Sequence, residues 1–305
     1  MRNIAFFLGK GGVGKTTLSA AFSLELAKRG KRVLVVSLDP AHNLGDALGI
    51  RLVDRPEPVL ERLFAMEIDL TAWVERYLEE SRSELKALYA YNSSFNLDSF
   101  FDIMRYSPGT EEYAMLWAIE NVYCELSAGY DVVVFDTPPT ALSLRFLALP
   151  TISGLWVNEL TKLREHILKK RQVISRLNPE SPVAASCVDK DDDRVHGKLS
   201  LISKRLGVLH RLFSEESFIS VIVNPDVLSV SEAMRIKDEL DRIGIGLHAA
   251  CLNKRGASTA AWRIDDGLKA LPLFELDYKP EGIRSPDDLS RVDVSALAAE
   301  FLGVE

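Results

Sequence analysis

The chain has 305 residues, of which 47% are hydrophobic and 27% charged, enough for one large core or two small ones. Its 37 Lys and Arg against 44 Asp and Glu give a formal charge of -7, so its surface repels phosphate backbones and no nucleic-acid partner is expected. The chain shows no secretory signal, and its apolar runs are far shorter than the roughly 20 residues of a membrane span. A cytoplasmic protein with no direct membrane span is therefore expected.

Six short runs of β-branched and aromatic residues are bounded by turn or functional residues and predict strands. The runs are continuous rather than alternating, which is typical of strands buried on both faces. Helical periodicity separates several of them, so we expect an α/β fold, a mostly parallel sheet covered by helices on both faces. The predicted strands are Ile4–Leu8, Val33–Leu38, Val132–Phe135, Phe218–Val223, Leu247–Leu252 and Leu271–Leu276.

The first predicted strand leads into a glycine-rich loop that matches G-x-x-x-x-G-K-[ST]. A strand before the loop and a helix after it, Thr16–Arg29, are the context that a phosphate-binding loop (P-loop) requires. Its backbone N–H groups and the helix N-terminus bind phosphate oxygens. Lys15 is expected to contact the β- and γ-phosphates, and the Thr16 hydroxyl to bind Mg²⁺. The predicted nucleotide-binding residues of this segment are Gly9, Lys10, Gly11, Gly12, Val13, Gly14, Lys15, Thr16 and Thr17.

Lys10 is an unusual second lysine in this loop, because one nucleotide in its own pocket does not need the added charge. The loop resembles the deviant Walker A motif, K-G-G-V-G-K-T, whose first lysine reaches across a dimer to the partner's nucleotide. The resemblance implies ATP as the nucleotide, catalytic roles for Lys10 and Lys15, and a dimer formed with an identical chain or a paralogue. Several ATPase families share this loop, so other segments must distinguish them.

A second functional segment follows the strand Val33–Leu38. Asp39 stands at its carboxyl end, where a carboxylate beside a P-loop can orient water for attack on the γ-phosphate. The segment resembles D-P-A-H-N-L-S-D-A, switch I of the ArsA and Get-pathway family, with Gly45 in place of serine. The resemblance implies that Asp39 activates water. It also assigns four further residues to the moving switch, Pro40, His42, Asn43 and Asp46. For His42 we favour a structural hydrogen bond, with proton transfer as the alternative.

Two stretches, at about residues 55–129 and 151–216, show helical periodicity instead. We expect them to form one inserted helical subdomain, so that 1–305 is a single P-loop ATPase domain. The Phe- and Met-rich segment Phe95–Met104 could be core or could line a groove for an apolar helix. The segment Asn178–Lys198, with two prolines and four aspartates, predicts a loop.

The strand Val132–Phe135 ends at Asp136, the usual position for the carboxylate on the Mg²⁺ side of P-loop proteins. Asp136 is therefore expected to hold a magnesium-bound water. The next residues resemble the family's switch II, D-T-A-P-T-G-H-T-L-R-x-L-x-L-P, with Ala141-Leu142 in place of Gly-His. The resemblance assigns to this switch Asp136, Thr137, Pro138 and Thr140.

Weaker matches extend the resemblance toward the C-terminus. A segment near residue 225 resembles the family's stretch near the dimer face, and Ser229 with Glu232 predicts a capping box for the helix there. Asn253 ends a strand where the family places an asparagine against adenine, with a plain strand-end turn as the alternative. The segment that resembles the family's loop over the base contains Pro272 and Leu273.

Together these segments resemble the ArsA and Get-pathway family of deviant Walker A P-loop ATPases. The resemblance implies a Mg²⁺-dependent ATP hydrolase acting as a nucleotide-switched dimer, and three roles stay open. We favour capture or targeting of tail-anchored membrane proteins by their transmembrane helix. An ATPase subunit that energises arsenite or anion efflux through a membrane channel is one alternative, and an ATP-dependent scaffold or regulator is the other. The three cysteines match no arsenite-binding cluster by spacing, namely Cys124, Cys187 and Cys251.

Overall fold

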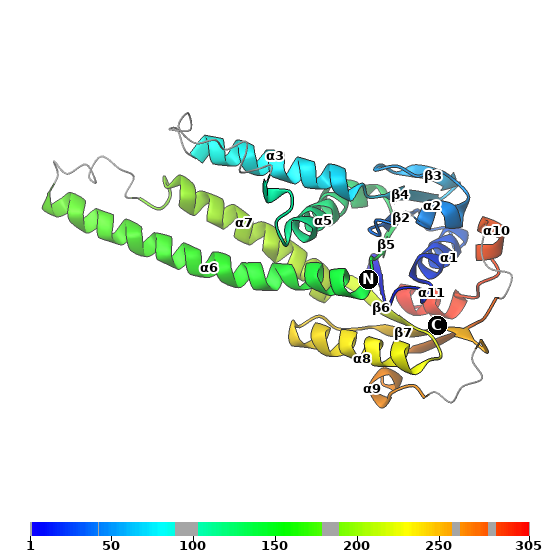
Figure 1. Cartoon of the computed structure of the whole chain (residues 1–305). Helices are drawn as coiled ribbons and strands as arrows, with labels where there is room; N and C mark the ends of the chain where they lie inside the picture. Colours follow the sequence, from blue (N-terminus) through cyan, green and yellow to red (C-terminus); the bar gives the residue numbers. More distant parts are fainter. Residues whose placement is uncertain are drawn as a thin grey trace.

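Eight strands form one sheet in the order β3-β4-β2-β5-β1-β6-β7-β8 in the computed structural model of this chain (Figure 1). All neighbouring strands are parallel except β3 and β4, which confirms the predicted α/β fold. The strands are β1 (Ile4–Leu8), β2 (Val33–Ser37), β3 (Glu57–Leu60), β4 (Leu63–Glu67), β5 (Val132–Asp136), β6 (Ser217–Val223), β7 (Ala249–Arg255) and β8 (Leu273–Asp277). The structure describes residues 2–41, 43–88, 103–178, 189–257, 263–279 and 285–304.

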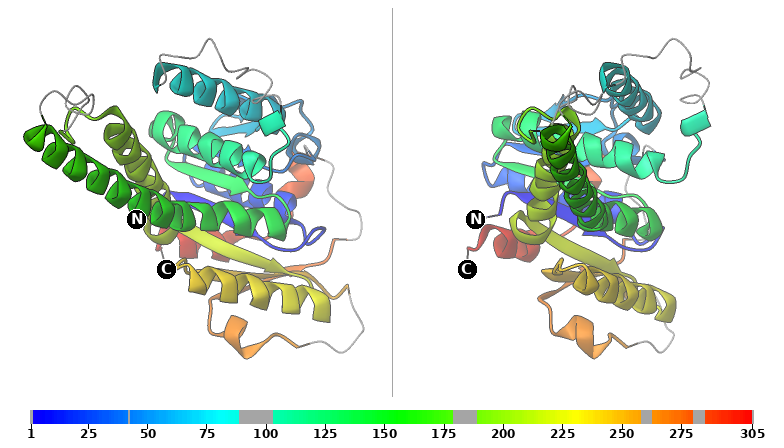
Figure 2. Two further views of the ribbon diagram at one scale, coloured as in Figure 1. Left: turned by 60° about the vertical axis from the view of Figure 1, so that its left-hand side comes forward. Right: turned by 90° about the vertical axis from the view of Figure 1, so that its left-hand side faces the viewer.

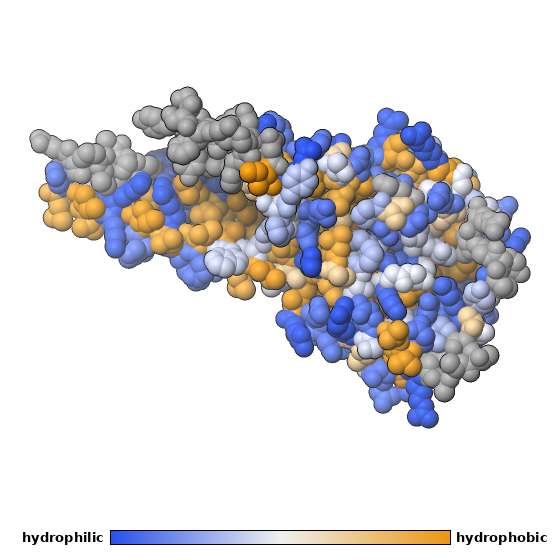
Figure 3. Space-filling view, viewed as in Figure 1, coloured by the Kyte–Doolittle hydropathy of each residue, from blue (hydrophilic) through white to orange (hydrophobic). Residues whose placement is uncertain are grey.

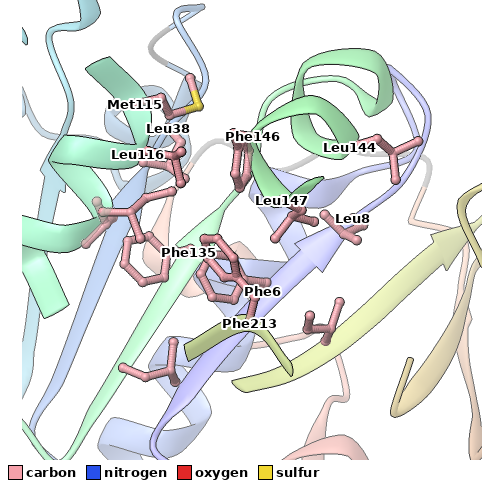
Figure 4. Packing of buried hydrophobic residues seen from close by; sticks show 14 of the residues in the cluster. Phe6, Leu8, Leu38, Met115, Leu116, Phe135, Leu144, Phe146, Leu147 and Phe213 are labelled. Carbon is pink, nitrogen blue, oxygen red and sulfur yellow. The ribbon is translucent and has the colours of Figure 1, made fainter. Parts of the chain in front are cut away.

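Both faces of the sheet are buried, because alternate residues of each central strand belong to two different cores. In one core, Phe6 stacks on Phe135 with ring centroids 4.6 Å apart, and Phe213 meets Phe6 edge-on (Figure 4). In the other core, Phe22 and Phe301 pack edge-to-face at 5.4 Å. The continuous apolar runs therefore predicted the two-sided burial correctly for β1, β2, β5 and β6, but wrongly for β8, an edge strand whose residues are mostly exposed.

The helices divide between these two cores. The core around Phe22 is covered by α1 (Lys15–Lys28), α2 (Asn43–Leu48), α10 (Pro286–Leu289) and α11 (Ser295–Leu302). The core around Phe6 is covered by α3 (Leu70–Leu88), α5 (Thr110–Asn121), α6 (Thr140–Leu177), α7 (Arg194–Arg211), α8 (Val227–Arg242) and α9 (Asp266–Lys269). Short helical turns continue α5 and α7 at Val122–Leu126, Ser127–Gly129 and Leu212–Glu216.

Helices α3, α6 and α7 extend beyond one end of the sheet and, with α5, form what we call the helical arm (Figures 1 and 2). Charged pairs join its helices: Arg205 of α7 contacts Glu120 of α5 at 2.6 Å, and Arg164 of α6 contacts Asp193 before α7 at 2.6 Å. The Arg164–Asp193 pair is largely shielded from water and holds its helices more firmly than a surface pair would, whereas the Arg205 side chain is 34% exposed.

The observed boundaries of the helical stretches differ from the expected ones. The stretch at about 55–129 begins with β3 and β4, which belong to the sheet, and the stretch at about 151–216 begins inside α6. Strand β3 begins with Glu57 and Pro58 and gives no strand pattern, and the four apolar residues of β4 before Glu67 were too short a run to be singled out. Helix α6 continues through Pro150, a residue that usually ends a helix.

Helix α6 is long and apolar enough, by length and composition alone, to cross a membrane, a property that short apolar runs in the sequence do not reveal. In the structure 44% of its most apolar window is buried, and the helix packs against α5, α7 and α8. A long core helix of a soluble protein meets the same two criteria, so α6 carries no membrane assignment.

Two local predictions were wrong, one of a helix start and one of the extent of a loop. Helix α8 begins at Val227 and is capped by Asp226, whose side chain accepts a hydrogen bond from the Ser229 N–H at 2.8 Å. Ser229 is thus inside the helix, and its hydroxyl accepts instead from the Asn224 N–H. Helix α7 begins at Arg194, inside the predicted loop 178–198, of which residues 179–188 lie outside the described part.

Candidate functional site

The P-loop connects β1 to α1 at the carboxyl edge of the sheet. Gly9 has a φ of +150°, and a Cβ there would lie 2.7 Å from the Ile222 carbonyl oxygen, so only glycine fits. Gly14, at a φ of +96°, adjoins the first residue of α1. The loop and the helix N-terminus together have the strand–loop–helix geometry that the motif predicted.

A cavity of about 490 Å³ opens above this loop and brings together most of the predicted site residues. The predicted residues that line it are Gly11, Gly12, Gly14, Lys15, Thr16, Thr17, Asp39, Asn43 and Asn253. Val13 is buried beneath the loop, and Lys10 is exposed beside it. His42 lies outside the described residues. The cavity also has lining residues that the sequence patterns did not predict, namely Leu18, Pro139, Lys254, Leu276, Asp277, Tyr278, Lys279 and Val292.

Lys15 is nearly buried, and its ammonium group is held by the loop itself. The Nζ atom donates to the carbonyl oxygens of Gly9 at 3.2 Å and Lys10 at 3.4 Å. Burial lowers the pKa of Lys15, while the nearby carboxylates of Asp136 and Asp39 oppose that decrease. The ammonium therefore lies among two carboxylates and the loop, where it can transfer its hydrogen bonds to phosphate oxygens.

Asp136 is completely buried at the end of β5, and neither carboxylate oxygen has a hydrogen-bond partner among the described residues. Burial raises the pKa of Asp136 to about 7, although the Thr16 hydroxyl and the Lys15 charge act in the opposite direction. A buried, unpartnered carboxylate is costly unless a cation completes it. With the neighbouring Thr16 hydroxyl it offers hard oxygen ligands, so these residues fit the predicted Mg²⁺ site.

Asp39 follows the carboxyl end of β2 and lines the cavity, near Lys15. Its Oδ1 accepts from the Ala41 N–H at 3.1 Å, and its own N–H donates to the Ser37 hydroxyl at 3.3 Å. These local bonds orient the carboxylate on a chain turn that precedes α2. Asp46, which the sequence also assigned to this switch, is exposed on the surface of α2, and Pro40 is exposed before it.

Sequence patterns did not reveal Glu67, the last residue of β4, whose side chain binds α2. Its side chain is 7% exposed, and Oε1 accepts from the Gly45 N–H at 2.9 Å. A Cβ at Gly45 would lie 2.7 Å from the Ile50 carbonyl oxygen, which explains why this chain has no serine there. The available signal is a carboxylate at the end of a short apolar run, the same pattern that identified Asp136.

The start of switch II is fixed to the sheet. The Thr137 hydroxyl donates to the Phe7 carbonyl oxygen at 2.6 Å, and the Ser143 hydroxyl donates to the Pro138 carbonyl oxygen at 2.7 Å. Thr140 begins α6, and its buried hydroxyl has no partner among the described residues. Leu142, which replaces the family's histidine, packs partly buried against the core around Phe6.

The predicted base-binding residues are only partly at the cavity. Asn253 lines it, but its Nδ2 donates to the Val13 carbonyl oxygen at 2.8 Å. Neither Pro272 nor Leu273, which begins β8 beside Ala250 of β7, lines the cavity, so the structure does not bring these two predicted residues to it. Residues 276–279, at the carboxyl end of β8 and just after it, line the cavity instead. At about 3.3 Å per residue of a strand, this end lies well away from Leu273.

A second candidate surface runs along α6 on the helical arm, which we call the α6 stripe. Eight large apolar side chains are exposed on α6, in two groups at 152–163 and 173–177 whose helical periodicity places them on one side of the helix, with exposed His166, Lys169 and Lys170 between the groups. Figure 3 shows apolar residues along this arm. The α6 stripe consists of Ile152, Leu155, Trp156, Leu160, Leu163, Val173, Ile174 and Leu177.

Comparison with known proteins identifies a family and several relatives of this chain. A family model described as anion-transporting ATPase matches residues 1–260. An Aquifex aeolicus protein named as an arsenical pump-driving ATPase is 31% identical over 260 residues, which cover 82% of this chain but only 63% of that relative. A second protein of that name and organism is 26% identical over 302 residues, covering 99% of this chain and 95% of the relative. The ATPase GET3 of Malassezia globosa is 34% identical over 256 residues, covering 81% of this chain and 70% of the relative.

Proposed function

The chain belongs to the anion-transporting ATPase family, and from that premise we propose that it is a cytosolic, Mg²⁺-dependent ATP hydrolase that switches between open and closed dimers and captures tail-anchored membrane proteins. We assign residues 1–305 to one ATPase domain whose helical arm holds the client. The catalytic part of the proposal is supported by the residues around the cavity. The client part is supported by the α6 stripe.

For hydrolysis, the P-loop N–H groups bind the phosphates and Lys15 moves its hydrogen bonds from the loop carbonyls to the β- and γ-phosphates. Asp39 orients the attacking water and accepts its proton. Thr16 and Asp136 would hold Mg²⁺, Asp136 through a water, and the ion would neutralise charge on the phosphates. The unpartnered oxygens of Asp136 are the observation that supports this metal assignment.

For the dimer, Lys10 is exposed beside the P-loop, free to reach a partner's nucleotide as the deviant Walker A motif implies. Val227 and Leu228, at the start of α8, are 68% and 69% exposed. These two apolar side chains follow β6 at the carboxyl edge of the sheet, in the segment that resembles the family's dimer face. An identical chain or a paralogue could complete this face.

The observation that carries the client proposal is the α6 stripe. Monomeric soluble proteins rarely expose large apolar patches, and the group at 152–163, with five exposed apolar side chains, therefore marks an interaction site. A transmembrane helix offers a complementary apolar surface of similar length, so the stripe fits the helix-in-groove mode of recognition. The same helix begins at switch II, which connects the stripe to the nucleotide.

Capture of an apolar helix tests this proposal directly. We expect Asp39→Asn protein, with ATP and Mg²⁺, to retain a peptide of about 20 apolar residues, and a scrambled polar peptide not to bind. Adding Leu155→Glu or Leu163→Glu should weaken capture at least about tenfold, because a charge enters the apolar face. The matched control is Asn158→Glu, which adds the same charge to an exposed position on another face of α6. Equal loss in the control, or no capture by the parent protein, would refute the client role.

The alternative supported by the names of two relatives is an ATPase subunit that drives arsenite or anion efflux. Arsenite prefers clustered thiolates. Of the described cysteines, Cys124 is exposed, whereas Cys251 is buried, and burial raises the pKa of its thiol to about 12. Stimulation of ATP hydrolysis by micromolar arsenite would favour efflux over targeting. ATP-dependent dimerisation with neither effect would leave the scaffold or regulator role.

A further inference from the structure

The carboxyl end of β7 contains an unusual backbone conformation. Lys254 has a φ of +56°, and among the described residues no other non-glycine residue has a positive φ. The register between β7 and β8 shifts at this point, between Leu252 and Arg255. A lysine adopts this left-handed conformation only where its surroundings hold it there, and such strain is concentrated at functional sites.

Two neighbouring side chains at this strand end bind two neighbouring carbonyl groups of the P-loop. Lys254 Nζ donates to the Gly12 carbonyl oxygen at 3.0 Å, and Asn253 Nδ2 donates to the Val13 carbonyl oxygen at 2.8 Å. The Asn253 Oδ1 atom in turn accepts from the Lys254 N–H at 2.8 Å. The left-handed turn at Lys254 therefore belongs to the same hydrogen-bonded unit as the loop contacts.

These contacts determine where the loop's N–H groups point. In a trans peptide the C=O of one residue and the N–H of the next point in opposite directions. Holding the carbonyls of Gly12 and Val13 toward β7 therefore directs the N–H groups of Val13 and Gly14 away from β7, where the Val13 N–H donates to the Lys10 carbonyl oxygen at 3.4 Å until a phosphate replaces that acceptor. We propose that Asn253 and Lys254 form a clamp, a pair of positioning residues that orients the P-loop peptides before a nucleotide's phosphates bind.

The packing around the clamp agrees with this assignment. A Cβ at Gly14 would lie 2.5 Å from Asn253 Nδ2, so the absence of a side chain at Gly14 lets the amide reach the loop. Within the described part of the chain Lys254 makes no ion pair, which leaves the P-loop carbonyl as its polar contact. Both clamp residues line the cavity above the loop.

The clamp rests on the proposed function, because it prepares the phosphate site of the ATPase. In base recognition Asn253 would contact adenine. The clamp instead holds the P-loop in one conformation even without nucleotide, and so raises the affinity for phosphates. Preformed N–H groups spare the ordering of the loop during binding. Loss of the clamp should therefore weaken binding of ATP and ADP alike.

Two substitutions at Lys254 separate the clamp from a plain turn. Lys254→Met removes the donor and keeps the chain length, and we expect the Kd of ADP to rise about fivefold, the effect of about 1 kcal/mol. Lys254→Gly removes both the donor and the backbone strain. It should therefore raise the Tm and still weaken ADP binding, whereas a residue that only makes a turn would raise the Tm and leave the Kd unchanged.

The measurement is titration calorimetry of ADP with Mg²⁺, beside thermal unfolding of the same samples. Lys254→Arg should restore the affinity, since it keeps a charged donor. Asn253→Ala should weaken ADP binding to a similar extent. Lys269→Met, which removes an exposed lysine of α9, is the control.

The outcomes separate the clamp from the proposed function. Lys279→Met removes the same charge from the cavity wall, and an equal loss there would assign the effect to charge alone and overturn the clamp. Unchanged Kd values in Lys254→Met and Asn253→Ala, with normal binding by the unmodified protein, would also overturn it. No ADP or ATP binding by the unmodified protein would instead refute the proposed ATPase, and the clamp with it.

Discussion

Replacing Asp136 by Asn should stabilise the nucleotide-free protein. The Asp136 carboxyl group is fully buried, its oxygens have no hydrogen-bond partner among the described residues, and burial raises its pKa from 3.8 to about 7. An acid whose pKa is higher in the folded state binds more protons folded than unfolded. The free energy of unfolding therefore falls as the pH rises from about 4 to about 7.

The size of the effect follows from that pKa change. A rise from 3.8 to about 7 corresponds to about 4 kcal/mol of destabilisation when the group is fully ionised, above pH 7. At pH 5 the Asp136 carboxyl group of the folded protein stays protonated, so only part of this destabilisation is present. The stabilisation by Asp136→Asn should therefore be about 2–3 kcal/mol larger at pH 8 than at pH 5.

Urea unfolding at the two pH values, without nucleotide or Mg²⁺, measures this difference. Asp238→Asn, at an exposed position of α8, is the control that removes a carboxylate without burial. The same Asp136 variant should lose Mg²⁺-dependent stabilisation of bound ATP, because the amide carries no charge. A stabilisation that does not change with pH would show that the carboxylate is not buried unpaired, and the reasoning would fail.

Three further substitutions test the site. Asp39→Asn should retain ATP binding and lower kcat at least about a hundredfold, since geometry survives and water activation does not; normal turnover in single-turnover assays would remove Asp39 from catalysis. Lys10→Ala should weaken ATP-dependent dimerisation, and light scattering that gives the unmodified monomer–dimer balance would exclude a role in trans. Glu67→Ala should lower stability by about 1–3 kcal/mol and reduce kcat, because the Gly45 N–H loses its acceptor; Glu67→Gln, which retains an acceptor, should restore most of both, and equal losses in the two variants would contradict this.

The sequence predicted those parts of the site that one continuous segment encodes. The P-loop, Asp39 and Asp136 each follow a buried strand directly, so the strand pattern and the polar residue after it occur together in the sequence. The parallel arrangement then brings these strand ends to one edge, where the P-loop and Asp39 line one cavity and Asp136 lies buried near Thr16 and Lys15. Local pattern and topology were sufficient here.

Contacts between distant segments could not be read in this way. Glu67 holds Gly45 from 22 residues away, and Lys254 reaches Gly12 across 242 residues. Neither pair has a local signature, because the contact depends on which strand ends are neighbours in the sheet. The end of β8 that lines the cavity could not be read locally either: Leu276 and Asp277 line it, whereas the predicted Leu273 at the start of the strand does not.

The 38 residues of α6 give the molecule a long mechanical lever. At 1.5 Å per residue the helix measures about 57 Å, from Thr140, four residues after Asp136, to Leu177 at the tip of the arm. A rotation of about 5° at the nucleotide end would move the tip by about 5 Å, roughly the width of one side-chain row. Displacements at switch II that are too small to matter locally would thus separate or join apolar surfaces at the far end. The stiffness of this one helix, rather than a series of intermediate contacts, would then determine how far the tip of the arm moves for a given movement at the start of α6.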